Sequence, residues 1–188
     1  MNKGVLLILS GPSGSGKDTV LEEILKVDSD TVMSVSMTTR KPRKGEINGK
    51  HYIFVSVQEF EENIKNGKMI EYVKYGENYY GSPKDPIDKW LSQGKTVILR
   101  IEVQGADKIR EIYPDVISVF LMPPSVETLH KRLRGRGSEN EDSIKRRMEI
   151  AKGEMLRASD YDYIVVNDRL DDAVKHTLEV IKRHRDEN

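Results

Sequence analysis

The part of the chain best suited to chemistry is a run of glycines that ends in a lysine, Gly11-Pro12-Ser13-Gly14-Ser15-Gly16-Lys17. Glycines let the backbone curl so tightly that successive N–H groups point at one anion, and the lysine adds an ammonium group. The run follows the apolar residues 5–9 and precedes a helix-like stretch at 18–26, whose N-terminus would add partial positive charge. An ordinary strand-to-helix turn is the alternative, but both flanks favour a cradle for the phosphates of ATP or GTP.

The position after the lysine departs from the usual pattern. A Ser or Thr there normally ligates magnesium, whereas this chain has Asp18, and the hydroxyl comes one place later at Thr19. An anion beside phosphates is unfavourable unless a metal ion lies between them, so we expect Asp18 to act through the water shell of Mg²⁺. Thr19 would then donate to the α-phosphate. The predicted ATP-binding residues are Gly11, Pro12, Ser13, Gly14, Ser15, Gly16, Lys17, Asp18 and Thr19.

A second group of polar residues lies further along the chain. Arg40 and Arg43 are three residues apart, and their guanidinium groups together with tyrosine hydroxyls can hold a phosphate, although solvated surface arginines are the ordinary interpretation. Glu71 is a lone carboxylate in the otherwise apolar, tyrosine-rich run 69–73. It can accept hydrogen bonds from N1–H and the exocyclic amine of guanine, whereas adenine has an acceptor at N1. These residues predict a site for a guanine nucleotide.

The composition excludes several classes of protein. The chain has 188 residues, which suits one compact domain with a sizeable core. Its 31 basic and 31 acidic residues balance, which argues against a general nucleic-acid binder. It has no cysteine, which excludes disulfides and thiolate metal sites, and its apolar N-terminal run is too short for a signal peptide or a membrane span. We therefore expect a cytoplasmic protein that binds neither nucleic acid nor a membrane.

Short β-rich runs alternate with helical patterns, which predicts a parallel sheet covered by helices. The predicted core strands are 5–10, 32–37, 96–101, 117–122 and 163–166. The alternation of strands and helices is interrupted near the middle of the chain. Short strands are predicted there at 52–55, 69–75 and 78–80, around one helix that begins at Ser56. An antiparallel patch inserted in a parallel α/β core suggests a separate lobe for a second substrate, and a decorative insertion is the alternative.

Together these motifs resemble the guanylate kinase family, the P-loop nucleoside-monophosphate kinases that phosphorylate GMP with ATP. The resemblance covers essentially the whole chain and rests on the segments 11–17, 36–43, 45–52, 70–72, 78–82 and 134–137. It implies an α/β fold with a P-loop kinase core, in which a parallel sheet is flanked by helices, a small inserted mixed or antiparallel GMP-binding lobe and a helical lid. It implies one domain, 1–188, divided into a core (1–35, 83–125 and 157–188), a lobe of about 36–82 and a lid of about 126–156.

The resemblance also implies roles for individual residues. The phosphate of GMP would be held by Arg40, Arg43, Tyr52 and Tyr80, and the guanine would be read by Ser36, Glu71 and Ser82. The arginines of the lid, Arg132, Arg136 and Arg147, would close over ATP and act with Lys17 in catalysis. Mg²⁺ would be bound through phosphates and waters, with Asp18 as a contributor. The expected partners are ATP and GMP or dGMP, and a homodimer is left open.

One further pair of positions departs from the family. The family usually shows two aspartates around an isoleucine after the third core strand, where this chain has Arg100 and Glu102. Glu102 can keep a carboxylate near guanine or near the waters of magnesium, and it is counted among the GMP-binding residues. Arg100 cannot take that part.

The expected reaction needs no general base, because the acceptor phosphate is largely a dianion at neutral pH. Two other functions remain open on the residues alone. One is a catalytically silent guanylate-kinase-like module that binds phosphorylated peptides, and the intact run 11–17 argues against it. The other is a kinase for adenylate or a pyrimidine nucleotide, which Ser36 and Glu71 disfavour.

Overall fold

The computed structural model describes residues 4–135 and 141–187, and its main feature is a five-stranded parallel sheet. The strand order is β2-β7-β1-β8-β9, where β2 is Thr31–Met33, β7 is Thr96–Arg100, β1 is Val5–Ser10, β8 is Ile117–Met122 and β9 is Tyr163–Val166. Three of these strands, β1, β8 and β9, have the bounds predicted from the sequence. Parallel strands covered on both faces are apolar throughout, which is why they could be read from the sequence.

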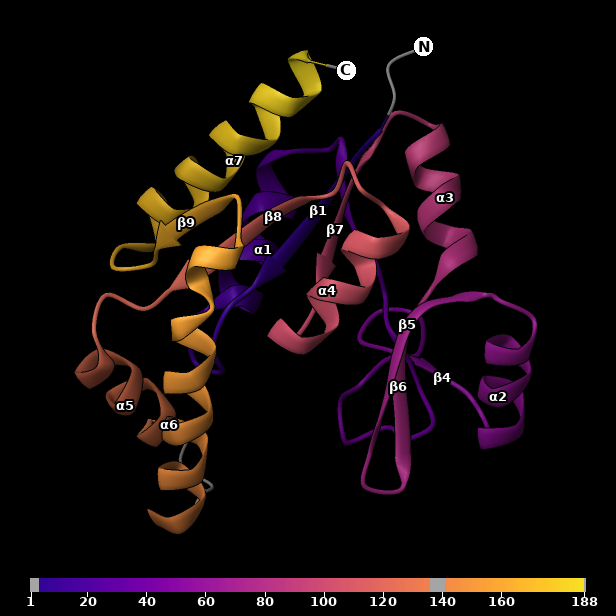
Figure 1. Ribbon diagram of the computed structural model, residues 1–188, viewed down its shortest axis with the longest axis horizontal. Coiled ribbons are helices and arrows are strands. Elements are labelled where there is room, and N and C mark those ends of the chain that lie inside the picture. Colours follow the sequence, from indigo (N-terminus) through magenta and orange to yellow (C-terminus); the bar gives the residue numbers. More distant parts are fainter. Residues whose placement is uncertain (1–3, 136–140, 188) are drawn as a thin grey trace.

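Helices cover both faces of this sheet (Figure 1). On one face, Leu7 and Leu9 pack with helices α1 (Lys17–Val27) and α7 (Leu170–Asp186). On the other, Leu6 and Ile8 pack with α3 (Lys84–Ser92) and α4 (Val103–Ile112). Successive side chains of a strand point to opposite faces, so β1, at the centre of the sheet, contributes residues to the hydrophobic cores on both faces. This burial fixes the end of β1, where the glycine run begins.

A second, four-stranded sheet has the order β4-β3-β6-β5. Its strands are β3 (Met37–Thr38), β4 (Ile53–Phe54), β5 (Met69–Tyr75) and β6 (Asn78–Pro83), and helix α2 (Val57–Lys65) lies beside them. The sheet is mixed, because β3 and β4 are parallel while β3–β6 and β5–β6 are antiparallel. The Ser56 hydroxyl caps α2 by accepting from the Glu59 N–H, and Phe60 of that helix stacks on Tyr79 with ring centroids 5.2 Å apart. The predicted α/β fold, with a parallel sheet flanked by helices and a second sheet of mixed strand direction, is therefore confirmed.

The prediction of one core strand over residues 32–37 is wrong. Strand β2 ends at Met33, and the chain resumes as β3 at Met37 in the other sheet. Ser34 still donates its N–H to the Ile98 carbonyl at 3.0 Å, while Ser36 accepts from the Ile53 N–H at 2.9 Å. One β-rich run thus bridges two sheets, a division that hydrophobic patterning does not reveal.

Helices α5 (Val126–Arg134) and α6 (Glu141–Leu156) form a helix pair with a small core of their own. Leu129 and Leu133 of α5 pack there against Ile144, Met148 and Ala151 of α6. The Ser125 hydroxyl caps α5 by accepting from the Thr128 N–H at 3.1 Å. In Figure 1 the helix pair and the second sheet both extend below the main sheet, one at the left and one at the right. A short 3-10 helix, Ala158–Asp160, joins α6 to β9.

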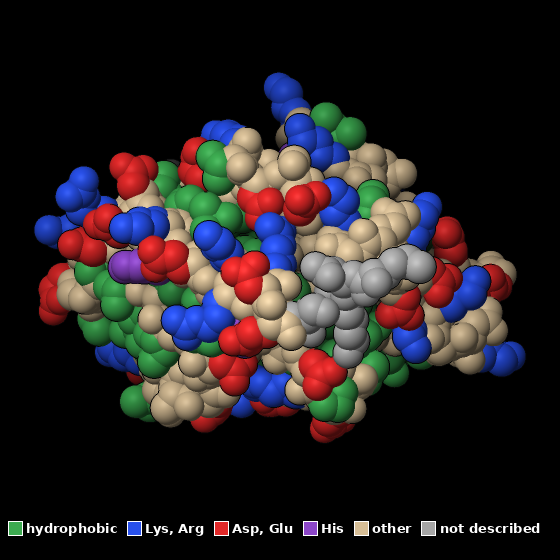
Figure 2. All heavy atoms as spheres, turned by 90° about the horizontal axis from the view of Figure 1, so that it is seen from above, with side chains coloured by type: hydrophobic (Ala, Val, Ile, Leu, Met, Phe, Trp, Pro, Cys, Tyr) green, Lys and Arg blue, Asp and Glu red, His purple; other side chains and the backbone are tan. Residues whose placement is uncertain are grey.

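Charged side chains are mixed over the surface. On the face seen in Figure 2, basic and acidic groups are interspersed, in keeping with equal numbers of the two in the sequence. Within residues 4–135 and 141–187, no helix is both long and apolar enough to cross a membrane.

Candidate functional site

The glycine run forms a tight turn, called here the phosphate loop (residues 11–17), between β1 and α1. Gly11 and Gly16 have φ angles of 142° and 96°, which residues with a Cβ rarely adopt. Space excludes side chains too, because a Cβ on Gly16 would lie 2.4 Å from Asn167 Nδ2, and one on Gly11 would lie 2.4 Å from the Leu121 carbonyl oxygen. Glycine is therefore required twice, and the loop carries its N–H groups to the N-terminus of α1, an arrangement that suits an anion.

Lys17 begins α1 and folds back over the loop. Its Nζ donates to the carbonyl oxygens of Gly11 at 2.5 Å and of Pro12 at 3.1 Å. Burial lowers the pKa of Lys17, and the carboxylates of Glu102, Glu154 and Asp18 act in the opposite direction. The ammonium group thus lies at the mouth of the loop, where phosphates would be bound.

Three elements far away in the sequence hold the loop in place. Asn167, after β9, donates from Nδ2 to the Ser15 carbonyl at 2.8 Å. Arg132 of α5 donates to the same carbonyl at 3.3 Å and to the Asn167 carbonyl at 2.9 Å, and Arg147 of α6 donates to the Ser13 hydroxyl at 2.5 Å. The structure therefore brings two of the three predicted lid arginines to the phosphate loop. The third, Arg136, lies outside the described residues.

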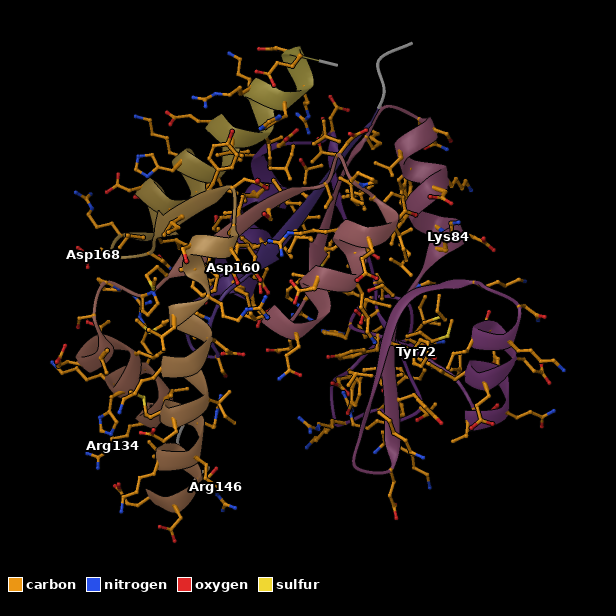
Figure 3. All side chains as sticks on the ribbon, viewed as in Figure 1. Tyr72, Lys84, Arg134, Arg146, Asp160 and Asp168 are labelled. Atoms are coloured by element: carbon orange, nitrogen blue, oxygen red, sulfur yellow. The ribbon has the colours of Figure 1, made fainter. Side chains whose placement is uncertain are left out.

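Other arginines of the helix pair do not reach the loop. Arg134 pairs with Glu141 at 2.6 Å, and Arg146 donates to the Asp142 carbonyl at 3.4 Å. Figure 3 shows both of them toward the end of the helix pair that is distant from the main sheet. Arg134 and Arg146 lie close in the sequence to Arg132 and Arg147, so spacing alone does not separate the two groups.

Asp18 has a partner that the sequence did not suggest. Its carboxylate accepts a hydrogen bond from Arg100 Nη1, so the two positions that depart from the family pattern form an ion pair. Thr19 beside it is exposed. Glu102 begins α4 as its N-cap residue and lies near enough to influence the pKa values of both Lys17 and Arg100.

The second sheet gathers an arginine and two tyrosines. Arg40 lies over the ring of Tyr52, 5.3 Å from its centroid, and Tyr52 meets Tyr80 edge to face at 6.1 Å. Glu46 binds both arms of the Arg40 guanidinium, at 2.7 and 2.8 Å, and accepts from the Arg43 N–H at 2.6 Å. The Arg40 guanidinium and the Arg43 N–H lower the pKa of Glu46 to about 2. A carboxylate thus already occupies the kind of receptor that was predicted for a phosphate.

Glu71 and Ser82 face each other across strands β5 and β6. The Ser82 hydroxyl donates to Glu71 Oε1 at 2.8 Å, and a register shift between Met69 and Glu71 marks a β-bulge, a feature that re-aims side chains. Burial raises the pKa of Glu71, while Ser82 and Lys108 act against the rise. Ser36 is half-buried just before β3, and Arg43 is exposed. The structure thus joins Glu71 and Ser82, two of the three residues that were predicted to bind the guanine.

The carboxylates near the phosphate loop could help to hold a divalent metal ion. Among the described ranges, no three His, Cys, Asp or Glu side chains are grouped so as to hold a metal. Mg²⁺ keeps several waters and is usually bound through one or two carboxylates together with substrate phosphates. Asp18, in the first turn of α1, and Glu102 supply such carboxylates. The donor set fits an ion that arrives with the nucleotide.

Sequence reasoning missed three contributors. The side chain of Asn167 clamps the loop, Glu46 holds Arg40, and Glu154 of α6 lies close enough to Lys17 for its carboxylate to influence the pKa of that lysine. Glu46 follows Arg40 and Arg43 at a spacing of three, a signal that was available in the sequence. Asn167 and Glu154 are far from residues 11–17 in the chain, so only the fold reveals them.

Comparisons with known proteins agree with one another. The family model described as Guanylate kinase matches residues 3–184. A guanylate kinase of Rickettsia felis is 44% identical over 98% of this chain and 96% of its own length, and one of Lactobacillus acidophilus is 50% identical over 96% and 89%. The crystal structure of guanylate kinase from Anaplasma phagocytophilum is 34% identical, covers 98% of this chain and 87% of its own, and gives a TM-score of 0.78.

Asn167→Ala tests the clamp on the phosphate loop. We expect binding of ADP to weaken by about tenfold, because the Ser15 carbonyl loses a hydrogen bond and the loop loses a tether. Binding of GMP should stay unchanged, and calorimetry with each nucleotide separately measures both. The control is Asn63→Ala, since Asn63 also donates to a backbone carbonyl, at 2.8 Å, but on the exposed helix α2. Equal losses in the two variants, or a matching loss of GMP binding, would contradict the assignment.

Proposed function

The chain belongs to the guanylate kinase family and transfers a phosphoryl group from ATP to GMP, giving ADP and GDP, and on that premise we propose the part that each residue takes. The observation that carries the proposal is that two polar sites stand on different sheets. One is the phosphate loop at the end of β1, and the other is the group of Arg40, Tyr52, Glu71 and Ser82 on the second sheet.

The donor nucleotide binds at the phosphate loop. Backbone N–H groups of residues 11–17 cradle its phosphates, Lys17 neutralises them, and Thr19 donates to the α-phosphate. Members of this family generally need a divalent metal, and here we propose Mg²⁺, held through the phosphates, waters and the nearby carboxylates. When bound, this ion supplies charge neutralisation on the transferred group. Glu102 shares in this role or lies near the guanine.

The acceptor binds at the second sheet. Arg40, Arg43, Tyr52 and Tyr80 hold the phosphate of GMP, and Ser36, Glu71 and Ser82 read its guanine. Support comes from the Ser82–Glu71 hydrogen bond, which leaves carboxylate lone pairs for the N1–H and amine of guanine. Both Nη atoms of Arg40 already donate to the Glu46 carboxylate. The phosphate of GMP must therefore share these donors with Glu46 or displace it. The deoxynucleotide dGMP presents the same phosphate and base, so we expect it to react as well.

Catalysis consists of positioning and charge neutralisation. The acceptor phosphate is mostly a dianion above its second pKa near 6, so no residue has to remove a proton from it. What remains is to hold the two nucleotides in line and to stabilise the charge of the moving phosphoryl group. Lys17, Arg132, Arg136 and Arg147 are the cations we assign to that work.

The chain divides by role into a core (1–35, 83–125 and 157–188), an acceptor lobe of about 36–82 and a lid of about 126–156. The lobe and the lid close on the core when both substrates bind. The separate small core of the helix pair supports this division. Because ATP and GMP are cytoplasmic metabolites, we propose that the enzyme acts in the cytoplasm.

Substrate choice is tested by following ADP formation with GMP, dGMP, AMP and UMP. We expect turnover with GMP and dGMP only. Glu71→Gln should lower kcat/KM for GMP by about 10² to 10⁴, because an amide hydrogen would oppose one of the guanine donors in a site built for a carboxylate. Glu77→Gln, on the exposed turn between β5 and β6, is the matched control. Turnover of AMP or UMP would favour another nucleotide kinase, and turnover of none would favour a silent binding module.

The raised pKa of Glu71 predicts a pH dependence of GMP binding. Only the ionised carboxylate accepts from both guanine donors, so binding should weaken as the pH falls and Glu71 takes up a proton, at a higher pH than an ordinary glutamate would because its pKa is raised. The phosphate of GMP also takes up a proton as the pH falls, and Glu71→Gln retains that contribution alone. Calorimetry should therefore show a several-fold larger pH effect in the wild type than in this variant. Equal pH effects in both proteins would contradict the role of Glu71.

Arg147→Met tests the catalytic role of the helix pair. We expect kcat to fall by at least about 100-fold, because the transferred phosphoryl group loses a cation, while the melting temperature changes little. The control is its neighbour Arg146→Met, since Arg146 bonds only to a carbonyl of its own helix among the described contacts. A kcat within a few-fold of wild type for Arg147→Met would show that the role is wrong.

A further inference from the structure

Arg100 stands at the junction of the two proposed sites. It is the last residue of β7, and it pairs in register with Leu9, the penultimate residue of the strand that leads into the phosphate loop. Its electrostatic neighbours include Asp18 of α1, Glu102 at the start of α4 and Tyr52 of the second sheet. Its charge also acts on Lys17. This guanidinium is therefore near residues assigned to the donor and residues assigned to the acceptor.

The guanidinium of Arg100 is only partly used by the protein. Nη1 donates to Asp18, and within residues 4–135 and 141–187 neither Nε nor Nη2 has a hydrogen-bond partner. The side chain is 30% exposed, against 55% for Asp18. A guanidinium carries five N–H donors in a rigid fork, and burying such donors without partners costs free energy. The remaining donors are thus available to an anion.

A plain stabilising ion pair accounts poorly for this arrangement. Partly exposed ion pairs contribute little to stability, and a simple pair gains nothing from its position between two phosphate sites. A neutralising partner for Asp18 alone would also need no second arm, and a lysine would serve. The guanidinium of an arginine can donate to Asp18 from one nitrogen and to a phosphate from another.

We propose that Arg100 binds the phosphates where the two nucleotides meet, and that Asp18 is a positioning residue that holds its guanidinium there. The proposal rests on the function proposed above and adds a cation to it. This replaces one part of the function proposed above: Asp18 acts through Arg100, and Mg²⁺ is held by the phosphates, by waters and by the remaining carboxylate, Glu102. In the ternary complex the free arm of Arg100 bonds to a phosphate oxygen at the junction, while Lys17 neutralises the donor side.

The test compares three ligands on Arg100→Met in the presence of Mg²⁺: ADP, GMP, and a bisubstrate analogue in which an oligophosphate joins adenosine to guanosine. We expect the analogue to bind about 30-fold more weakly, the loss of one charge-assisted hydrogen bond, and ADP and GMP each to change by less than about threefold. Lys95→Met is the matched control, because it removes another ion pair, Lys95–Asp30 at 2.7 Å, beside the opposite end of β7. It should leave all three affinities unchanged.

Arg100→Lys keeps the charge and most of the side chain, and serves if the first variant does not fold. It too should weaken the analogue more than the mononucleotides, because an ammonium group lacks two separate arms. An analogue affinity equal to wild type in a folded variant, or equal losses for all three ligands, would overturn the proposal. Failure of the wild type to bind ADP or GMP would instead count against the proposed function.

Asp18→Asn tests the positioning role. We expect a smaller loss of analogue affinity than in Arg100→Met, and no further loss when the two substitutions are combined, because Asp18 works through Arg100. Additive losses in the double variant would show that Asp18 acts independently, as a contact to the metal's waters would, and would overturn its assignment as a positioning residue.

Discussion

The turn between β1 and α1 is the constraint on which the rest of the structure depends. Its backbone can direct N–H groups at one anion only with left-handed or otherwise glycine-specific φ angles at Gly11 and Gly16. Neighbouring atoms come so close that even a methyl group would collide, so the loop is held from outside as well as by its own dihedral angles. The Ser15 carbonyl receives donors from Asn167 and Arg132, which ties β9 and the helix pair to the same loop. The end of β9 and helix α5 are thereby fixed relative to the phosphate loop.

Much of this architecture could be predicted from the sequence, because buried parallel strands are short apolar runs with recognisable flanks. The bounds of β1, β8 and β9 came out as expected. The prediction of a single strand at residues 32–37 was wrong, because these residues divide between two sheets. A local pattern holds no information on which strand will be the neighbour of another. The contact of Arg100 with Asp18 spans 82 positions, and that of Asn167 with Ser15 spans 152. Such pairs follow from the order of strands in the main sheet, which sequence spacing cannot supply.

The charges of the two sites follow a common plan, in which carboxylates hold the cations that await phosphate. Glu46 takes both arms of Arg40, and Asp18 takes one arm of Arg100. Each carboxylate keeps a guanidinium ordered, which lowers the entropy lost when a phosphate binds. The two cases differ in geometry. Glu46 occupies the fork that a phosphate would use, whereas Asp18 leaves N–H donors of Arg100 unpartnered within the described chain. A phosphate that binds Arg40 therefore has to share the guanidinium with Glu46 or displace it, whereas a phosphate that binds Arg100 finds N–H donors that are free among the described residues.

This difference bears on the order of events at the two sites. A phosphate that displaces a carboxylate from Arg40 must repay the loss of two charge-assisted hydrogen bonds, so acceptor binding is coupled to a rearrangement of the segment around Glu46. A phosphate that adds to Arg100 meets a guanidinium already in place on the rigid end of β7. We infer that the acceptor lobe supplies the adjustable part of recognition, and that the edge of the parallel sheet supplies the fixed reference against which the two nucleotides are aligned. A phosphoryl transfer with no proton to remove depends on such alignment more than on any single side chain.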